Sequence, residues 1–168
     1  MKRQLLSAAV ALALLASAAV AQMAAPPAEE FVTMASSSDM FEIQSSTAAL
    51  EKAESAEVKQ FAQMMIADHG KSSEELLAAV QESGLDITPP GAMVEKHKEP
   101  FDAMNAANVP DFDAAYIDAQ VVAHQEAIAL MQSYAESGDN EALRAHAEKT
   151  LPVIQAHFEH AQKLDTTN

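Results

Sequence analysis

Hydrophobic side chains recur along most of the chain at intervals of three and four residues, which places them on one face of an α-helix. No stretch alternates hydrophobic and polar residues as a half-buried β-strand does, and only 4 glycines interrupt the 168 residues. Alanine, the strongest helix former, is abundant throughout. The pattern therefore predicts an all-α fold.

Capping and turn residues divide this pattern into four helices of similar length. We predict these helices over residues 29–53, 55–83, 111–137 and 141–164. Ser55 and Asp111 are residue types that cap helix N-termini, and Gly84 stands where a C-cap glycine is common. The Gly-Asp-Asn sequence at 138–140 suits a tight turn between the last two helices. Together these features predict a four-helix bundle.

The segment over residues 85–110, which joins the second and third helices, is expected to be irregular. Pro89-Pro90 and Pro110 close its two ends, and Pro100 limits any helix within it to short pieces. Such a connection is long for neighbouring antiparallel helices, but it can travel the length of a bundle, as in ferritin-like topology. An up-down bundle with a long excursion is the alternative. The segment contains no motif that indicates a ligand or a partner.

The N-terminus has the form of a bacterial signal peptide. Lys2 and Arg3 precede an apolar run over residues 5–20, and Ala19-Val20-Ala21 is a small-x-small cleavage sequence. The run is shorter than the about 20 residues that cross a bilayer, which disfavours a retained membrane anchor. We predict a signal peptide over 1–21, a disordered spacer over 22–28 and the bundle over 29–165. Cleavage near Ala21 would leave a periplasmic or secreted protein without membrane insertion.

Composition narrows the classes of function. The net charge of −15 gives a surface that repels nucleic acid and anionic lipid, so we expect no nucleic-acid partner. The absence of cysteine excludes disulfides, thiol catalysis and Cys-based zinc sites. No nucleophile motif, Gly-rich phosphate loop or dinucleotide fingerprint is present, which disfavours an enzyme. Oligomerisation and an unidentified protein partner stay open.

Polar residues interrupt the apolar stripes of the predicted helices. His69, His124 and His157 each replace a hydrophobic residue on a different helix, and Glu42 lies on the shallower apolar face of the first. Three of these four residues stand within about one residue of their helix midpoint, whereas His157 lies about five residues beyond its own, or roughly 7 Å. We therefore predict that all four side chains meet at one height in the core.

One carboxylate and three imidazoles form a reasonable site for zinc, copper or non-haem iron. We predict Glu42, His69, His124 and His157 as metal ligands, with Asp68 and Tyr116 as supporting groups outside them. The alternative is a metal-free core network, in which Glu42 pairs with His124, or Asp68 with a neighbouring histidine. An unpaired buried polar group costs about 1–3 kcal/mol, so such pairing is required in either case.

Two further histidines, His97 and His146, lie in polar surroundings, and we predict that both face solvent. The 9 methionines leave copper open, because thioethers bind Cu(I), although methionine is also a common filler of helical cores. Neither observation changes the predicted ligand set.

Three stretches resemble the bacterial DUF4142 family, a domain of unknown function placed among ferritin-like proteins. They are "FVTMASSSDMFEIQSSTAALEKAESAEVKQFAQMMIADHGKSSEELLAAV", "FDAAYIDAQVVAHQEAIALM" and "LPVIQAHFEHAQKL". The positions that recur in that family correspond here to Glu42, Asp68, His69, Asp113, Tyr116, His124, Pro152 and His157. The resemblance implies a ferritin-like fold and export from the cell. It implies no reaction, because no activity is established for the family.

A di-iron centre of the ferritin type is not expected. Such a centre needs a Glu-x-x-His sequence on each of two helices. Ile66, Val121 and Ile154 stand three residues before His69, His124 and His157, respectively, where that sequence has glutamate. A single ion in a histidine-rich site is therefore the metal-bound alternative that we predict.

Overall fold

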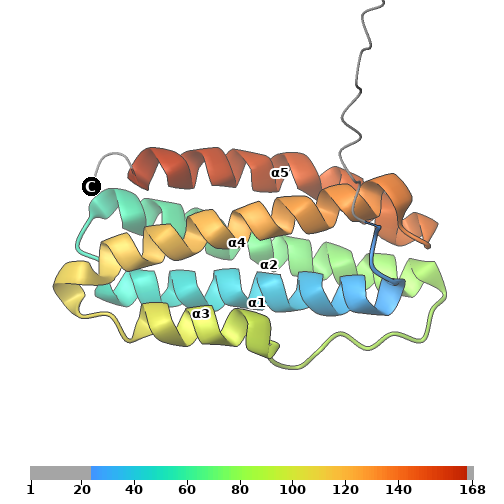
Figure 1. Ribbon diagram of the computed structural model, residues 1–168, viewed down its shortest axis with the longest axis horizontal. Helices are drawn as coiled ribbons and strands as arrows, with labels where there is room; N and C mark the ends of the chain where they lie inside the picture. Colours follow the sequence, from blue (N-terminus) through green and yellow to red (C-terminus); the bar gives the residue numbers. More distant parts are fainter. Residues whose placement is uncertain (1–23, 166–168) are drawn as a thin grey trace, which may run out of the picture.

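The computed structural model describes residues 24–165, so the predicted signal peptide and the start of the spacer lie outside the described residues. Within this range the chain forms five helices and no strand (Figure 1). They are α1 (Ala28–Lys52), α2 (Ala56–Ser83), α3 (Glu95–Asn105), α4 (Val109–Ser137) and α5 (Glu141–Asp165). The predicted all-α fold is confirmed, whereas the predicted number of four helices is wrong.

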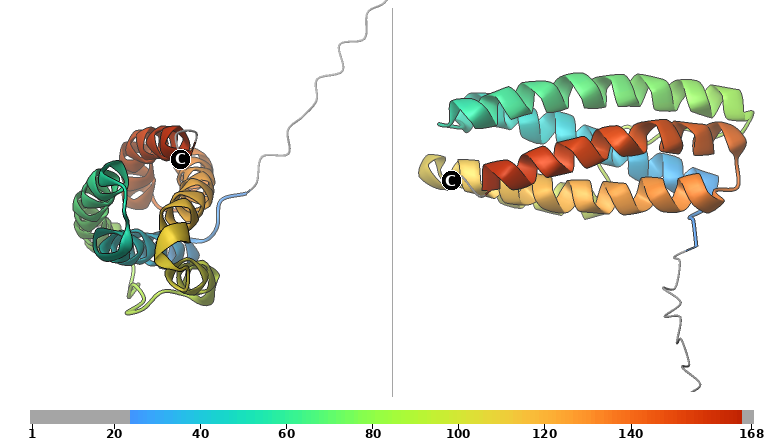
Figure 2. Two further views of the ribbon diagram at one scale, coloured as in Figure 1. Left: turned by 90° about the vertical axis from the view of Figure 1, so that its left-hand side faces the viewer. Right: turned by 90° about the horizontal axis from the view of Figure 1, so that it is seen from above.

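The four long helices lie side by side, and the short α3 lies outside them (Figures 1 and 2). α1 packs against α2 and α4 against α5, while α2 also contacts α5 and α1 contacts α4. The connection between α2 and α4 returns along the length of the molecule, so these two helices run in the same direction (Figure 1). This is the expected crossing rather than the up-down alternative.

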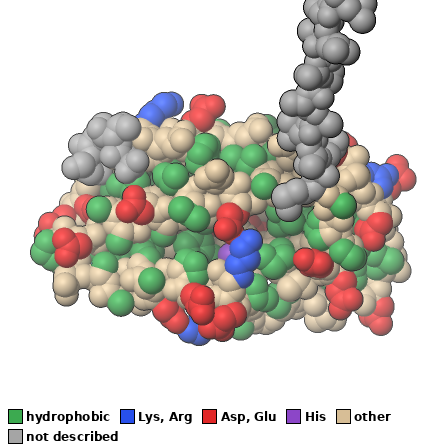
Figure 3. All heavy atoms as spheres, in the orientation of Figure 1, with side chains coloured by type: hydrophobic (Ala, Val, Ile, Leu, Met, Phe, Trp, Pro, Cys, Tyr) green, Lys and Arg blue, Asp and Glu red, His purple; other side chains and the backbone are tan. Residues whose placement is uncertain are grey.

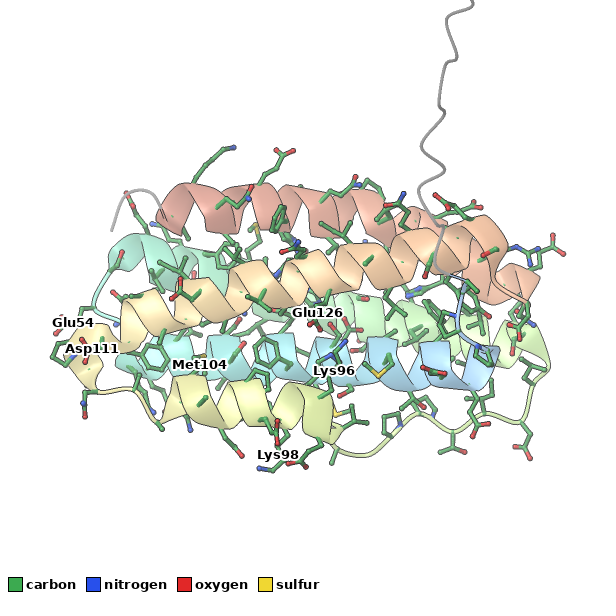
Figure 4. All side chains as sticks on the ribbon, viewed as in Figure 1. Glu54, Lys96, Lys98, Met104, Asp111 and Glu126 are labelled. Carbon is green, nitrogen blue, oxygen red and sulfur yellow. The ribbon has the colours of Figure 1, made fainter. Side chains whose placement is uncertain are left out.

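Helix α3 corrects the prediction of an irregular connection, because it runs for 11 residues with Pro100 in its interior. Contacts with the long helices hold it in place. The Lys52 amino group donates to the backbone and side-chain oxygens of Asn105, at 2.6 Å each, and Lys96 pairs with Glu126 at 2.8 Å (Figure 4). Met104, a residue of α3 itself, is buried. These tertiary contacts offset the helix-breaking effect of one proline.

The ends of the long helices follow the predicted capping residues with one exception. The Ser55 side chain accepts a hydrogen bond from the Val58 amide at 3.4 Å, and Gly84 adopts a left-handed conformation with φ of 69° after α2. Asp111 was the expected N-cap of the third long helix, but Asn108 occupies that position and α4 begins two residues earlier. Pro110 fits the first turn because that turn needs no backbone N–H donor there.

The core is divided along its length into two apolar ends and a polar middle. One apolar cluster contains Phe31, Leu76, Tyr134, Leu143 and Ile154, and the other contains Phe61, Met65, Phe112, Ile117 and Leu164. Between them lie buried polar residues: Asp39, Glu42, Ser45, Ser46, His69, Gln120, His124 and His157. The candidate site belongs to this polar layer.

Acidic side chains are spread over the face formed by α1, α3 and α4, in keeping with the net charge of −15 (Figure 3). Within residues 24–165 no helix is both long and apolar enough to span a membrane.

Candidate metal centre

Three imidazole rings from three helices meet in the polar layer. His69 lies on α2, His124 on α4 and His157 on α5, and each is less than 5% exposed. Their ring centroids are 5.5 to 5.7 Å apart, so they form a nearly equilateral triangle. One nitrogen from each ring lies within 4.8 Å of the other two.

Each ring has one nitrogen fixed by a neighbouring group. The Nδ1 atom of His69 is 2.8 Å from Asp39 Oδ1, and Ser73 donates to the other carboxylate oxygen at 3.2 Å. The Nδ1 atom of His124 is 2.9 Å from the Gln120 backbone oxygen. These acceptors hold a proton on Nδ1 and leave Nε2 without a partner among the described residues.

His157 is bound the other way round, since its Nε2 atom is 3.0 Å from Asp68 Oδ2 and its Nδ1 atom is the free one. The three free nitrogens are buried and have no hydrogen-bond partner among the described residues. Each buried nitrogen without a hydrogen bond lowers the stability of the fold by about 1–3 kcal/mol. The three rings each carry one such nitrogen and each offer one nitrogen within 4.8 Å of the others, an arrangement that favours an additional group between the rings.

Glu42 lies beside this triangle rather than within it. Its Oε1 atom is 3.6 Å from Nδ1 of His124, and the carboxyl group is not part of the close-set group of three histidines. Its Oε2 atom is buried without a partner among the described residues. Burial raises the pKa of Glu42 from 4.5 to about 7, against the opposing effect of the His69 charge. The group is thus a carboxyl that ionises readily once a cation arrives.

The electrostatic environment distinguishes the three imidazoles. Burial lowers the pKa of His124 to about 3, with a further contribution from the charge on His69, and lowers that of His157 to about 4. Burial also acts to lower the pKa of His69, but the hydrogen bond that its Nδ1–H donates to Asp39 and the nearby Glu42 charge outweigh it and raise the pKa. At neutral pH two of the rings are therefore neutral imidazoles, the form that binds metal ions.

His124 and His157 lie closer in height along the bundle than their positions relative to the helix midpoints indicated. α4 and α5 are joined by the turn at 138–140, so their relative height is set from that turn. Counted from it, His124 and His157 differ by about three residues, or roughly 5 Å, which side chains and helix tilt span easily. Midpoints were the poorer reference because α4 has 29 residues and α5 has 25, so their midpoints lie at different distances from the shared turn.

The two predicted supporting groups behave differently. Asp68 contacts His157 on the neighbouring helix α5 rather than the adjacent His69. Tyr116 shares a 2.8 Å hydrogen bond with Ser46, one turn from Glu42, and makes no hydrogen bond to the three rings among the described residues.

Two other histidine predictions are wrong. His146 is only 5% exposed, and its Nε2 atom is buried without a partner among the described residues. His97 is half-buried and its Nδ1 atom lies 2.7 Å from Ser37 Oγ, where α3 packs on α1. Local polarity of the sequence misled both predictions, because the polar neighbours point outward while the imidazoles point inward.

Sequence reasoning missed Asp39 and Gln120. Asp39 stands one turn before Glu42 on the inner face of α1, in a buried polar stripe that includes Ser38, Ser45 and Ser46. A run of small polar residues on one helix face was the available signal. Gln120 accepts from His124 through its backbone oxygen, which no side-chain pattern reports, and its side chain donates to Ser45.

The donor set fits a transition-metal ion. A metal ion at 2.0–2.1 Å from three nitrogens in tetrahedral geometry holds those nitrogens about 3.4 Å apart. The observed limit of 4.8 Å therefore requires the rings to move inward by about 1 Å, a shift that side-chain rotation provides. Neutral nitrogens with fixed outer hydrogen bonds are the usual metal-binding arrangement of histidine.

Comparison with solved structures finds helical proteins of the same fold. The structures described as "CopM in the Cu(II)-bound form" and "CopM in the Cu(I)-bound form" match with TM-scores of 0.67 and 0.66, each at 18% identity. The first match covers 84% of this chain and 97% of that chain, the second 82% and 94%. A DUF305 fragment from Deinococcus radiodurans matches with a TM-score of 0.71 at 12% identity, over 87% and 100% of the two chains. At these identities the likeness establishes the fold.

Sequence comparison gives the family. No curated protein sequence matches the chain. The sequence profile of DUF4142, described as a domain of unknown function, matches residues 13–164 and so includes all five helices except the last residue of α5. The chain belongs to the DUF4142 family.

Proposed function

We propose that this protein binds a single transition-metal ion between the free nitrogens of His69, His124 and His157. The observation that carries the proposal is the convergence of three buried imidazoles, which offer one nitrogen each within 4.8 Å of the others and each have a nitrogen without a partner among the described residues. Glu42 lies beside His124 and supplies a compensating negative charge, or a fourth ligand after a small movement. The proton that Glu42 holds near neutral pH leaves when the cation binds.

Copper and zinc suit this donor set best. Imidazole nitrogen binds both ions well, whereas an iron site of the ferritin type uses several carboxylates. The fold shared with a protein solved in Cu(I)-bound and Cu(II)-bound forms supports copper within this pair. Met65 and Met131 are also buried in the core, although both pack within the apolar clusters.

The proposed role is metal handling or protection against metal stress, without catalysis. The three rings are almost fully buried, so a bound ion has little room for a substrate beside it. Export fits this role. The signal-peptide sequence at residues 1–21 supports delivery to the periplasm or the medium, and the long crossover supports a ferritin-like bundle as the mature domain.

The test is metal content and affinity in protein purified without a histidine tag. After chelator treatment, the chain is dialysed against Cu²⁺ or Zn²⁺, and bound metal is measured by elemental analysis. We expect one ion per chain in the wild type and almost none in His69→Ala or His124→Ala. The matched control is His160→Ala, an exposed histidine on α5 one turn from His157, which should keep one ion.

Thermal unfolding provides the second readout. A ligand present at 100 times its dissociation constant stabilises the folded state by about 2.7 kcal/mol. The melting temperature should therefore rise with Cu²⁺ or Zn²⁺ in the wild type and in His160→Ala, but not in His124→Ala. Substoichiometric metal in the wild type, or equal metal in His124→Ala, would exclude the site.

A second candidate is a structural or interaction module in which the polar layer only sets helix register. Hydrogen bonds between helices favour it, namely Asp39 to His69, Asp68 to His157, Ser45 to Gln120 and Ser46 to Tyr116. This role leaves the three inner nitrogens unexplained. It predicts that His124→Ala lowers stability while Cu²⁺ and Zn²⁺ leave the melting temperature of the wild type unchanged.

A further inference from the structure

The three imidazoles differ in the exposure of the groups that hold them. Asp39, which binds His69, is itself buried, with a side chain that is 7% exposed. His124 is held by the backbone of its own helix. His157 is held by Asp68, whose side chain is 42% exposed. Only this third ring is therefore fixed by a group in contact with solvent.

The side of the bundle that carries Asp68 is also the side that α3 leaves uncovered. α3 packs on α1 and α4, whereas Asp68 and His157 lie on α2 and α5, which contact each other on the opposite side (Figure 2). Two clefts of about 1060 and 250 Å³ lie on the α3 side. Neither is lined by His69, His124 or His157, so neither leads directly to the inner nitrogens.

The two ring nitrogens of His157 have different surroundings. Its Nδ1 atom is buried without a partner among the described residues, whereas its Nε2 atom bonds the partly exposed Asp68. When the hydrogen bond to Asp68 breaks, this ring loses the one outer partner that fixes its Nε2 atom. Along the α1–α4 side, by contrast, an ion would have to pass α3 as well.

We propose that Asp68 and His157 form the gate through which the metal ion enters and leaves, an inference that rests on the proposed metal-binding function. Asp68 is a positioning residue: its carboxylate accepts the Nε2–H hydrogen bond and holds the ring closed. A cation that approaches the seam between α2 and α5 pairs with this carboxylate, which frees the ring to swing outward. When the ring returns, Nδ1 meets the ion and Nε2–H binds Asp68 again.

The test measures the rates of metal uptake and release by stopped flow, with Cu²⁺ followed by its visible absorption and Zn²⁺ by a colorimetric chelator. Asp68→Ala removes the hydrogen bond that closes the gate, so uptake and release should both accelerate. Substitution of a residue that hydrogen-bonds a metal ligand typically changes metal binding by 10- to 100-fold. We therefore expect each rate to rise on the order of 10-fold. The dissociation constant should change less than either rate.

Three variants make the result specific. Glu74→Ala removes an exposed carboxylate from the same helix and should leave both rates unchanged, because one surface charge is largely screened at physiological salt. Asp39→Asn weakens the buried support of His69 and should raise the dissociation constant without faster uptake. Asp68→Asn keeps an acceptor oxygen and should give intermediate rates, which preserves the test if Asp68→Ala folds poorly.

The outcomes separate the two proposals. Faster release from Asp68→Ala with unchanged uptake would overturn the gate and leave Asp68 as a group that only orients His157. Unchanged rates in both directions would overturn it as well. If the wild type binds neither Cu²⁺ nor Zn²⁺ at equilibrium, the metal-binding function itself fails, and the gate fails with it.

Discussion

Glu42→Gln should make the stability of the metal-free protein less sensitive to pH, because it removes a buried group that ionises reluctantly. Glu42 is 1% exposed, and burial raises its pKa from 4.5 in the unfolded chain to about 7 in the folded one. Below pH 4.5 the carboxyl is neutral in both states and contributes no pH-dependent term. As the pH rises from 4.5 to about 7, the carboxyl of the unfolded chain loses its proton first, and the unfolded state becomes relatively more stable.

The size of the effect follows from the same two values. One pKa unit corresponds to about 1.4 kcal/mol, so the raised pKa costs the wild type about 3 kcal/mol of stability above pH 7. Most of this cost develops between pH 5 and pH 8. The free energy of unfolding of Glu42→Gln, relative to the wild type, should therefore increase by about 2–3 kcal/mol over that range, since glutamine does not ionise.

Urea denaturation, followed by circular dichroism in the presence of a chelator, measures this difference at each pH. Glu51→Gln makes the same charge change at an exposed position of α1 and controls for the net charge of the molecule. A stability difference between Glu42→Gln and the wild type that stays constant from pH 5 to pH 8 would refute the reasoning. It would mean that Glu42 titrates alike in the folded and unfolded chains.

Four further predictions concern other parts of the chain. Gly84→Ala should lower the free energy of unfolding by about 1 kcal/mol in urea denaturation, because φ is 69° at this position. Gly70→Ala should raise it by about 1 kcal/mol, because open space surrounds this position in the middle of α2 and alanine favours a helix over glycine. Tyr116→Phe should cost about 1–3 kcal/mol in the same assay, as Ser46 loses its buried partner. Mass spectrometry of protein exported from a Gram-negative host should find Gln22 at the N-terminus, and an intact residue 1–21 segment would contradict the signal peptide.

Local sequence features were sufficient to predict the long helices, because periodicity and capping act within a few residues. Ser55 and Gly84 mark the ends of α2 as expected, and α1 begins and ends within one residue of its predicted bounds. α3 was missed because Pro100 opposes a helix locally. The contacts that hold α3 in place join it to other helices: Lys52 of α1 donates to Asn105, and Lys96 of α3 pairs with Glu126 of α4. Helix propensity is weaker than such packing.

The sequence by itself determined that polar residues interrupt four apolar faces, and therefore that His69, His124 and His157 would be buried at comparable depth. Only the tertiary structure decided which atoms of these residues meet. The turn at 138–140 sets the height of α5 against α4, and Glu42 is left beside the triangle. Asp39, the Gln120 backbone oxygen and Asp68 decide which nitrogen of His69, His124 and His157, respectively, is hydrogen-bonded. Periodicity gives the face on which a side chain lies, but ring orientation and hydrogen-bond partners depend on neighbouring helices, whose stagger no local pattern encodes.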